Sequence, residues 1–204
     1  AINLAFKAIN LKKNDIVILP IINFISSTNI LTQLNAKVFY SDVDPLTGQM
    51  TPDLLNQCIK KNKLKNIKAF VTMYLGGCCN YNYDFFKLKK KLNCYMIEDA
   101  CHALGADYKI KNRYYKIGSC KHADVSTFSL HPVKSITTGE GGIVTTNKKE
   151  IFNKIISYRS HGIKRNKDKH WDYDIVNSGY NFRLSDINCS LGLSQLKKLN
   201  KFIK

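Results

Sequence analysis

A single lysine stands between two β-branched runs in the stretch TFSLHPVKSITTGEGGIVTTN, residues 127–147. Lys134 follows Pro132 and Val133, and few other charged residues flank it. A lysine held in a partly desolvated pocket has a lowered pKa and becomes a nucleophilic amine that can form a Schiff base with a carbonyl compound. A solvated surface lysine is the other interpretation in a chain this basic. The pattern marks Lys134 as a candidate catalytic residue and leaves both interpretations open.

The glycines that follow this lysine do not make a phosphate-binding loop. A P-loop places its lysine after the first glycines, and a dinucleotide-binding fingerprint opens a helix. Here Lys134 precedes the glycines, and Gly139 and Gly141 lead into an apolar, strand-like run. We interpret Gly141 and Gly142 as a tight backbone entry into a strand, with positive φ or close approach to a ligand.

A carboxylate one strand earlier gives this lysine a chemical partner. Asp99 ends the run CYMIED, and Lys134 lies beyond the next predicted strand. A pyridoxal 5'-phosphate enzyme needs a lysine for the Schiff base and a carboxylate that keeps the pyridine nitrogen protonated, so that the ring can accept electrons. Without Lys134, a helix cap or a solvated turn explains Glu98 and Asp99 equally well. The two residues together predict pyridoxal phosphate chemistry.

The cysteines and histidines offer a metal site as an alternative. A zinc centre could be drawn from a group whose spacing fits no common ligand pattern: Cys101, His102, Cys120 and His122. The chain has seven cysteines, and none of them makes a CxxC pair. Apolar periodic segments contain three of the seven: Cys58, Cys94 and Cys189. We therefore expect reduced, mostly packed thiols and no metal.

These side chains need a scaffold, which the sequence predicts from alternating strand and helix patterns. Short β-branched runs predict strands over 15–20, 37–43, 67–75, 94–100, 124–130 and 142–147. Amphipathic patterns predict helices over 26–35, 52–63, 84–92, 148–158 and 185–203. This alternation is typical of a three-layer α/β domain, a mainly parallel mixed sheet flanked by helices. The segment from Gly162 to Gly179 is expected to be the longest irregular loop.

The predicted strands also indicate where a ligand should bind. Open α/β sheets bind their ligands at the carboxyl ends of the strands. Three polar segments follow apolar strands in this chain, NFISST, EDACH and SLHPVKS. We expect these segments to meet at one edge of the sheet.

Composition bounds the possible partners and the location of the protein. The net charge of +17 raises the possibility of nucleic-acid binding. Nearly all positive residues are lysines spread along the chain, whereas arginine is preferred for bidentate phosphate and base contacts, so a solvated surface is favoured. There is no apolar run long enough to span a membrane and no secretory leader. We expect a soluble, cytoplasmic protein with no nucleic-acid and no membrane partner.

Four segments give the chain a resemblance to the DegT/DnrJ/EryC1/StrS family of sugar aminotransferases. They are IEDACHALGA, STFSLHPVKSITTGEGGIVTTN, RSHG and GYNFRLSDINCSLGLSQL, and the similarity runs in order from about Asn3 to the end. The segment HPVKSITTGEGG is most similar to the branch that acts on UDP-4-keto-6-deoxy-N-acetylhexosamines in pseudaminic acid synthesis. The resemblance implies transfer of an amino group from glutamate to C4 of such a UDP-linked keto sugar.

The resemblance also implies a fold and an assembly. Residues 1–204 would form the large domain of a fold type I PLP-dependent transferase, and the active site would be shared across a homodimer. Both ends of the chain lie inside amphipathic patterns, AINLAFKAINLKK and SLGLSQLKKLNKFIK, so we expect a domain truncated at both ends. The small carboxy-terminal domain would follow Lys204.

Carried over to this chain, the family motifs imply roles for several side chains. Lys134 would hold pyridoxal 5'-phosphate covalently and later move the proton between Cα and C4′. Asp99 would pair with the pyridinium nitrogen, and His102 would lie near the phenolic oxygen. Ser129 would hydrogen-bond the cofactor phosphate or the substrate.

Two further residues would complete this set. Phe24 would place its ring over the pyridine face, and Asn181 would reach the phosphate from the neighbouring subunit. Simpler alternatives remain for the minor members: Phe24 as a core residue, His102 as a satisfied buried histidine, Ser129 as a turn cap and Asn181 as a turn former.

Two rival functions remain within the same family. A PLP-dependent sugar dehydratase is the first, although those relatives replace the lysine with histidine and this chain retains Lys134. The second is an inactive or regulatory fragment. The segment LGGCCNYN departs from the sequence that the family usually has at this position. The resemblance therefore does not define the details of the substrate pocket.

Overall fold

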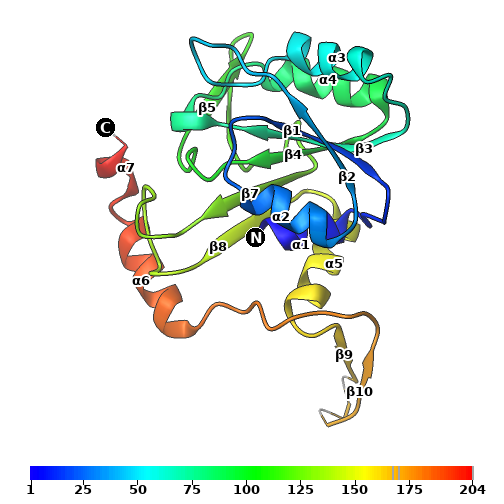
Figure 1. The fold of residues 1–204 in the computed structure, drawn as a ribbon. Coiled ribbons are helices and arrows are strands. Elements are labelled where there is room, and N and C mark those ends of the chain that lie inside the picture. The colour runs from blue at the N-terminus through cyan, green and yellow to red at the C-terminus, as the bar shows by residue number, and fades with distance from the viewer. Residues whose placement is uncertain (167, 170, 204) are drawn as a thin grey trace.

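A six-stranded sheet forms the centre of the molecule (Figure 1). The computed structural model describes residues 1–166, 168–169 and 171–203 and gives the strand order β2-β1-β3-β4-β7-β8. Neighbouring strands run parallel from β2 to β7, and β8 is antiparallel to β7. The mainly parallel mixed sheet predicted from the sequence is confirmed. Its strands are β1 (Ile16–Pro20), β2 (Lys37–Ser41), β3 (Ile67–Met73), β4 (Tyr95–Asp99), β7 (Val125–Ser129) and β8 (Gly142–Thr145).

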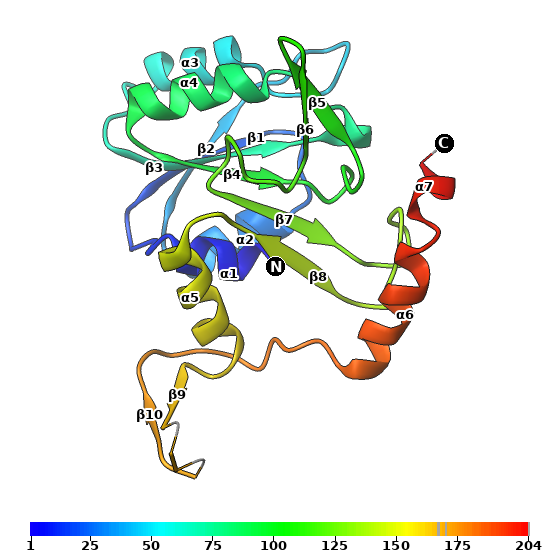
Figure 2. The same cartoon turned by 180° about the vertical axis from the view of Figure 1, so that it is seen from behind.

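Helices cover both faces of this sheet and complete the three layers (Figures 1 and 2). One face carries α1 (Ile2–Ala8), α2 (Ser26–Gln33) and α5 (Lys149–Arg159), and the other carries α3 (Pro52–Lys61) and α4 (Asn82–Leu92). Successive strand residues point to opposite faces. Val17 and Leu19 therefore pack on the α1 side, whereas Ile18 packs under α3 and α4. Burial on both faces explains why this strand reads as an unbroken apolar run.

Local signals in the sequence define the first helix of the second face. The Thr51 hydroxyl accepts a hydrogen bond of 3.2 Å from the Leu54 amide, and Pro52 follows directly in the first turn. Both are favourable because the first amides of a helix lack partners within it.

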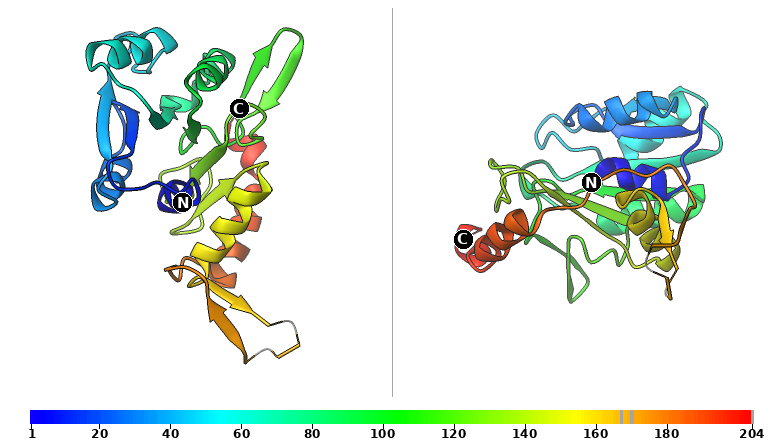
Figure 3. Two further views of the ribbon diagram at one scale, coloured as in Figure 1. Left: turned by 90° about the vertical axis from the view of Figure 1, so that its right-hand side faces the viewer. Right: turned by 90° about the horizontal axis from the view of Figure 1, so that it is seen from below.

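Two sequence-based expectations about secondary structure were wrong, and one hairpin was not predicted. The loop expected over 162–179 contains the hairpin of β9 (Ile163–Arg165) and β10 (Tyr173–Ile175), which projects from the body (Figure 3). A second hairpin, β5 (Asp107–Ile110) with β6 (Arg113–Lys116), was not predicted. The single helix expected over 185–203 is divided into α6 (Asp186–Leu196) and α7 (Leu199–Phe202). Strands of three or four residues carry too few side chains for a period of two to be visible in the sequence.

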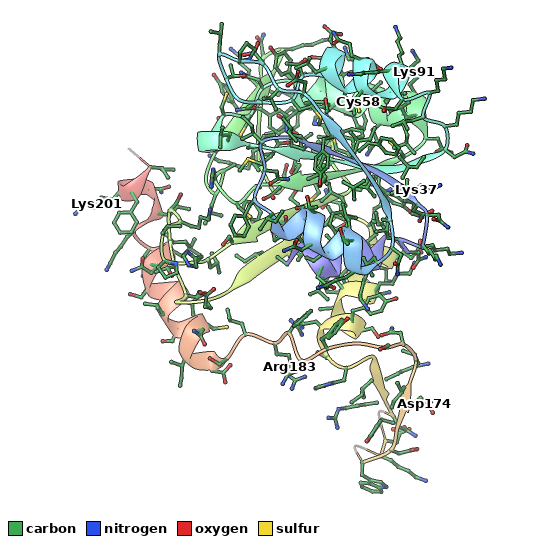
Figure 4. The ribbon with its side chains drawn as sticks, in the orientation of Figure 1. Lys37, Cys58, Lys91, Asp174, Arg183 and Lys201 are labelled. Atoms are coloured by element: carbon green, nitrogen blue, oxygen red, sulfur yellow. The ribbon has the colours of Figure 1, made fainter. Side chains whose placement is uncertain are left out.

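Side chains are densest in the three layers and sparse in the outlying elements. In Figure 4, Asp174 in β10 and Lys201 in α7 lie at the periphery of the molecule. All seven cysteines are free. Cys58 is buried and Cys94 is half-buried, but Cys189 on α6 is exposed, so the expectation of packing was wrong for that thiol.

In the part of the chain that the structure describes, no helix has the length and apolar character needed to cross a membrane.

The two glycines at the start of β8 lack the positive φ that was one of the two expectations, and both lie close to neighbouring atoms of the chain. A Cβ at Gly141 would lie 2.2 Å from the Thr138 hydroxyl oxygen, and one at Gly142 would lie 2.9 Å from the Phe128 carbonyl oxygen. Positive φ occurs earlier, at Gly139. Gly141 and Gly142 therefore need small size, and Gly139 supplies the turn.

A buried carboxylate connects β4 to three neighbouring segments. Glu98 is 2% exposed, and its Oε1 accepts hydrogen bonds from Tyr74 Oη at 2.8 Å and from Asn82 Nδ2 at 3.2 Å. The Ser126 hydroxyl donates to Oε2. Tyr74 follows β3, Asn82 begins α4 and Ser126 lies in β7, so this side chain joins the sheet to α4.

The environment of Glu98 predicts a pH-dependent contribution to stability. Burial raises the pKa of Glu98, while hydrogen bonds from Ser126 and Tyr74 act in the opposite direction. The folded state therefore binds this proton more tightly than the unfolded chain does. The free energy of unfolding should fall as pH rises from the ordinary pKa, about 4.3, through the folded-state pKa. Glu98→Gln keeps the shape and should remove this fall, measured as the wild-type minus variant difference in urea unfolding across pH.

Glu150→Gln is the matched control, because Glu150 is exposed and a hydrogen bond from Lys154 lowers its pKa. Its contribution has the opposite sign, since it is lost as pH falls through the folded-state pKa. A Glu98 difference that is constant or that rises with pH would contradict this prediction.

Candidate active site

A cavity of about 610 Å³ lies at the carboxyl ends of the parallel strands. Residues that follow β1, β3, β4 and β7 line it, so the three polar segments expected to meet do so. Five of the six predicted site residues are among its walls: Phe24, Asp99, His102, Ser129 and Lys134. The sixth, Asn181, is not.

Asp99 is the last residue of β4 and is 4% exposed. The Cys101 amide donates to its Oδ1 at 3.3 Å. Burial and the neighbouring Asp99 charge raise the pKa of the Cys101 thiol to about 12, so this thiol is neutral beside the carboxylate. Within the described part of the chain, Asp99 forms no ion pair.

Two other buried acids, Glu98 and Asp124, have partners within the chain that stabilise a carboxylate. Glu98 accepts hydrogen bonds from three side chains. Asp124, which is 2% exposed, pairs with Lys89 at 3.2 Å and with Lys148 at 2.7 Å. A buried carboxylate needs hydrogen bonds or a cation. Glu98 has three side-chain donors and Asp124 has two cations, whereas Asp99 has the Cys101 amide and no cation among the described residues, so Asp99 is available for a positively charged ligand atom. A protonated ring nitrogen fits this requirement.

Lys134 lies in the segment after β7, on the same side of the cavity as the end of that strand. Its amide donates to the His131 carbonyl at 3.0 Å, which closes a turn and fixes the backbone. The side chain is half-buried, and its positive charge acts on both His102 and Cys101. The amine is therefore near the residues that follow Asp99, as a covalent cofactor anchor requires.

His102 lies on the turn that follows β4. The Gly76 amide donates to its Nδ1 at 3.4 Å. Burial lowers the pKa of His102, the Lys134 charge lowers it further, and the Asp99 charge acts in the opposite direction. The ring is consequently biased toward its neutral form.

The remaining predicted residues have different surroundings. The Ser129 hydroxyl accepts a hydrogen bond from the His131 amide at 3.3 Å, as a turn residue does, yet it also lines the cavity. The Phe24 side chain is 72% exposed, which excludes the alternative that it is a core residue. Asn181 is exposed and forms an isolated β-bridge with Ser160, away from the cavity walls.

The proposed zinc group is not assembled as a single cluster. Cys101 and His102 line the cavity, whereas Cys120 contacts Ser126 and Thr145 in the interior. The Nδ1 atom of His122 forms a hydrogen bond of 2.6 Å with the Tyr108 hydroxyl. In the described residues, no group of three or more His, Cys, Asp and Glu side chains could hold a metal ion.

Asn23 is one of the polar residues of the cavity wall that sequence reasoning did not single out. Asn23 follows β1, and its Oδ1 accepts a hydrogen bond of 2.7 Å from the Phe24 amide. Its Nδ2 is buried without a partner and is a free donor beside the cavity. The signal was present in the segment NFISST, which was identified only as a strand end.

The comparisons with known proteins agree with this geometry. The sequence model of the DegT/DnrJ/EryC1/StrS aminotransferase family matches residues 1–204. The UDP-4-amino-4,6-dideoxy-N-acetyl-beta-L-altrosamine transaminase of Campylobacter jejuni subsp. jejuni serotype O:23/36 (strain 81-176) is 41% identical over 200 residues, covering 98% of this chain and 50% of that protein. This chain thus spans about half the length of the curated relatives it matches.

Two solved structures extend the comparison to the fold. Helicobacter pylori PseC, an aminotransferase involved in the biosynthesis of pseudoaminic acid, superposes with a TM-score of 0.83 at 29% identity, covering 97% of this chain and 51% of that one. NtdA of Bacillus subtilis, solved with its cofactor PMP bound, has a TM-score of 0.82 at 25% identity, covering 98% and 42%. The predicted fold type I architecture is confirmed. The sequence match along the whole chain and these superpositions show that the chain belongs to the DegT/DnrJ/EryC1/StrS aminotransferase family.

Proposed function

We propose that the full-length protein is a pyridoxal phosphate-dependent aminotransferase that moves an amino group from glutamate to C4 of a UDP-linked 4-keto-6-deoxy-N-acetylhexosamine. The observation that carries the proposal is the buried Asp99 carboxylate, which has no ion pair in the described chain and faces a cavity that also contains Lys134. The similarity to a UDP-sugar transaminase supports the substrate class.

The donor set of the cavity fits the cofactor. When bound, pyridoxal phosphate supplies a carbonyl carbon that takes up an amino group and a ring that accepts electrons. Asp99 would hold the ring nitrogen in its protonated form. Lys134 Nζ would anchor the cofactor and, once released, would carry the proton removed from one substrate carbon and returned to another.

The surrounding side chains would orient the cofactor and keep water out. His102 would donate to an acceptor oxygen, and Ser129 would donate to the phosphate or the substrate. The exposed ring of Phe24 would cover one face of the bound ring, which would bury apolar surface on both. Asn23 adds an unused donor on the same wall.

The assembly and the domain limits remain predictions. A homodimer would let the exposed Asn181 reach the cavity of a second copy, which is consistent with its absence from the walls of its own cavity. Residues 1–204 would constitute the cofactor-binding large domain. The cytoplasmic location is likewise a prediction.

Replacement of the anchoring lysine should abolish the covalent complex. Full-length protein with pyridoxal phosphate should absorb in the near-visible range, and borohydride reduction should attach the cofactor to Lys134. Lys134→Ala should lose this band and lower turnover by about 10³-fold or more, because both the anchor and the proton carrier are removed. Lys109→Ala, on the outlying strand β5, is the control and should keep the band. A wild-type protein that folds but lacks the band would contradict the enzyme proposal.

Replacement of the cavity carboxylate should separate stability from activity. Asp99→Asn removes a buried charge that has no cation, so the cofactor-free protein should unfold at the same or a higher urea concentration. Turnover should nevertheless fall by about 10²–10⁴-fold, since the ring nitrogen loses its counterion.

Asp124→Asn is the matched control for this prediction. It breaks ion pairs with Lys89 and Lys148 and should destabilise the cofactor-free protein. Equal destabilisation by both variants would show that the Asp99 charge is compensated within the chain. The proposal would then lose its main support, a buried carboxylate that has no cation.

The substrate is tested by direct turnover. Full-length protein should release more than one equivalent of 2-oxoglutarate per active site from glutamate only when a UDP-linked 4-keto-6-deoxy-N-acetylhexosamine is present to accept the amino group. The GDP-linked 4-keto sugar should react more slowly. Turnover with the GDP sugar alone would keep the transaminase and reject the proposed substrate. Water loss from the sugar without amino transfer would favour the dehydratase.

A further inference from the structure

The turn after β3 contacts the backbone and the ring of His102. This turn, η1 (Leu75–Gly77), belongs to the segment LGGCCNYN that departs from the usual family wording. Gly76 and Gly77 both have positive φ, 63° and 83°. The Gly76 amide donates to His102 Nδ1, and a Cβ at Gly77 would lie 3.0 Å from the His102 carbonyl oxygen. The two glycines therefore bring the turn against this histidine from two directions.

The hydrogen bond defines which ring nitrogen can carry a proton. A nitrogen that accepts from an amide is unprotonated, so the neutral ring of His102 carries its proton on Nε2. Protonation of Nδ1 would set two N–H groups against each other and break the contact with Gly76. The geometry thus disfavours both the imidazolium and the other neutral tautomer.

Burial and the Lys134 charge favour the neutral ring of His102, as this hydrogen bond does, and the Asp99 charge opposes them. Asp99 from β4 is an anion and Lys134 from the segment after β7 is a cation. Cys101, the preceding residue, is a neutral thiol, since burial raises its pKa to about 12. On the η1 side Cys79 is also a neutral thiol, with a pKa raised by burial to about 12. Burial and Lys134 outweigh Asp99 and lower the pKa of His102.

We propose that the Gly76–Gly77 turn is a positioning element that holds His102 as the neutral Nε2–H tautomer, so that this proton is a fixed hydrogen-bond donor in the cavity. The ligand class is an acceptor oxygen, either on the aromatic ring of the cofactor or on the sugar. The identity of that oxygen rests on the proposed function, whereas the tautomer and its cause do not.

The turn also explains why glycine is needed at two consecutive positions. Positive φ is strained for residues with a Cβ, so either glycine would resist substitution on that ground alone. Only at Gly77 would the added carbon also meet His102; nothing lies within 4 Å of a Cβ at Gly76. The pair Gly76→Ala and Gly77→Ala therefore separates backbone strain from the contact with the histidine.

The test is nitrogen-15 NMR of the histidine rings in full-length protein without cofactor. His102→Gln assigns the resonance, and His122, whose Nδ1 is bound to the Tyr108 hydroxyl, is an internal reference. Wild-type His102 should be the Nε2–H tautomer and should titrate below the ordinary histidine pKa, about 6.5. Gly77→Ala should shift His102 toward the Nδ1–H form or raise its pKa. Gly76→Ala strains the backbone that presents the donating amide but meets no part of His102, so it should shift them less.

A second measurement tests the donor itself. Gln can donate from a side-chain amide without titrating, so His102→Gln should bind pyridoxal phosphate within about threefold of wild type and lose the decrease in affinity at low pH. His102→Phe should weaken cofactor binding by about tenfold or more. If His102→Gln and His102→Phe bind pyridoxal phosphate alike but differ about tenfold in KM for the keto sugar, the acceptor lies on the sugar.

Three results would overturn the proposal. The first is a wild-type His102 that carries its proton on Nδ1, and the second is one that titrates at or above the ordinary pKa. The third is a Gly77→Ala protein that folds with an unchanged His102 spectrum. Because the NMR experiment uses no cofactor and no sugar, failure of the proposed enzymatic function would leave its outcome intact.

Discussion

The last two residues of β4, Glu98 and Asp99, are buried carboxylates that must lie on opposite faces of the sheet. Successive strand residues point to opposite faces, so Glu98 enters the layer under α4 while Asp99 faces the α1 side and the cavity. Glu98 accepts hydrogen bonds from three side chains, whereas Asp99 accepts one from the Cys101 amide and has no ion pair among the described residues. A one-residue shift of β4 would exchange the two faces and place each carboxylate among the wrong partners. The Glu98 contacts with Tyr74, Asn82 and Ser126 therefore fix the register that the cavity depends on.

The same contacts place the turn that approaches His102. Tyr74 and Asn82 stand on either side of the segment from Leu75 to Tyr81, and both bind Glu98. The segment between them is consequently held at both ends by one buried group. This explains how a turn with two glycines can keep a defined contact with the ring of His102. Structural burial on one face of the sheet thereby supports an ordered site on the other.

The sequence predicted the strand ends well because strand and helix periods are long enough to detect there. Five predicted site residues end an apolar strand or lie in the segment after one: Phe24, Asp99, His102, Ser129 and Lys134. Parallel strands bring their carboxyl ends to one edge of the sheet, so this placement does not depend on the conformation of the loops. The short hairpins were missed because three or four residues do not establish a period. The division near Lys197 was missed because no glycine or proline marks it.

The sequence did not predict contacts between individual atoms. The pattern around LGGCCNYN showed only that two glycines were present, and their contact with His102 depends on how closely β3 and β4 end together. The free Nδ2 of Asn23 depends in the same way on its own side-chain oxygen bonding the next amide. Such features are decided by tertiary distances of a few tenths of an ångström, which no residue pattern records.

The cavity divides into two parts that can change separately. Asp99 and Ser129 end β4 and β7, where sheet pairing fixes the backbone, and Lys134 follows in a turn closed by its hydrogen bond to the His131 carbonyl. Asn23 and Leu75 lie on the segments after β1 and β3, outside the paired strands. Loops tolerate substitution better than paired strands do. The strand-end groups therefore suit the chemistry that all members of a family share, and the outer segments suit the selection of one substrate. The segment LGGCCNYN lies among these outer segments, yet its glycine turn contacts His102, so a change there would also reach a residue of the cavity wall.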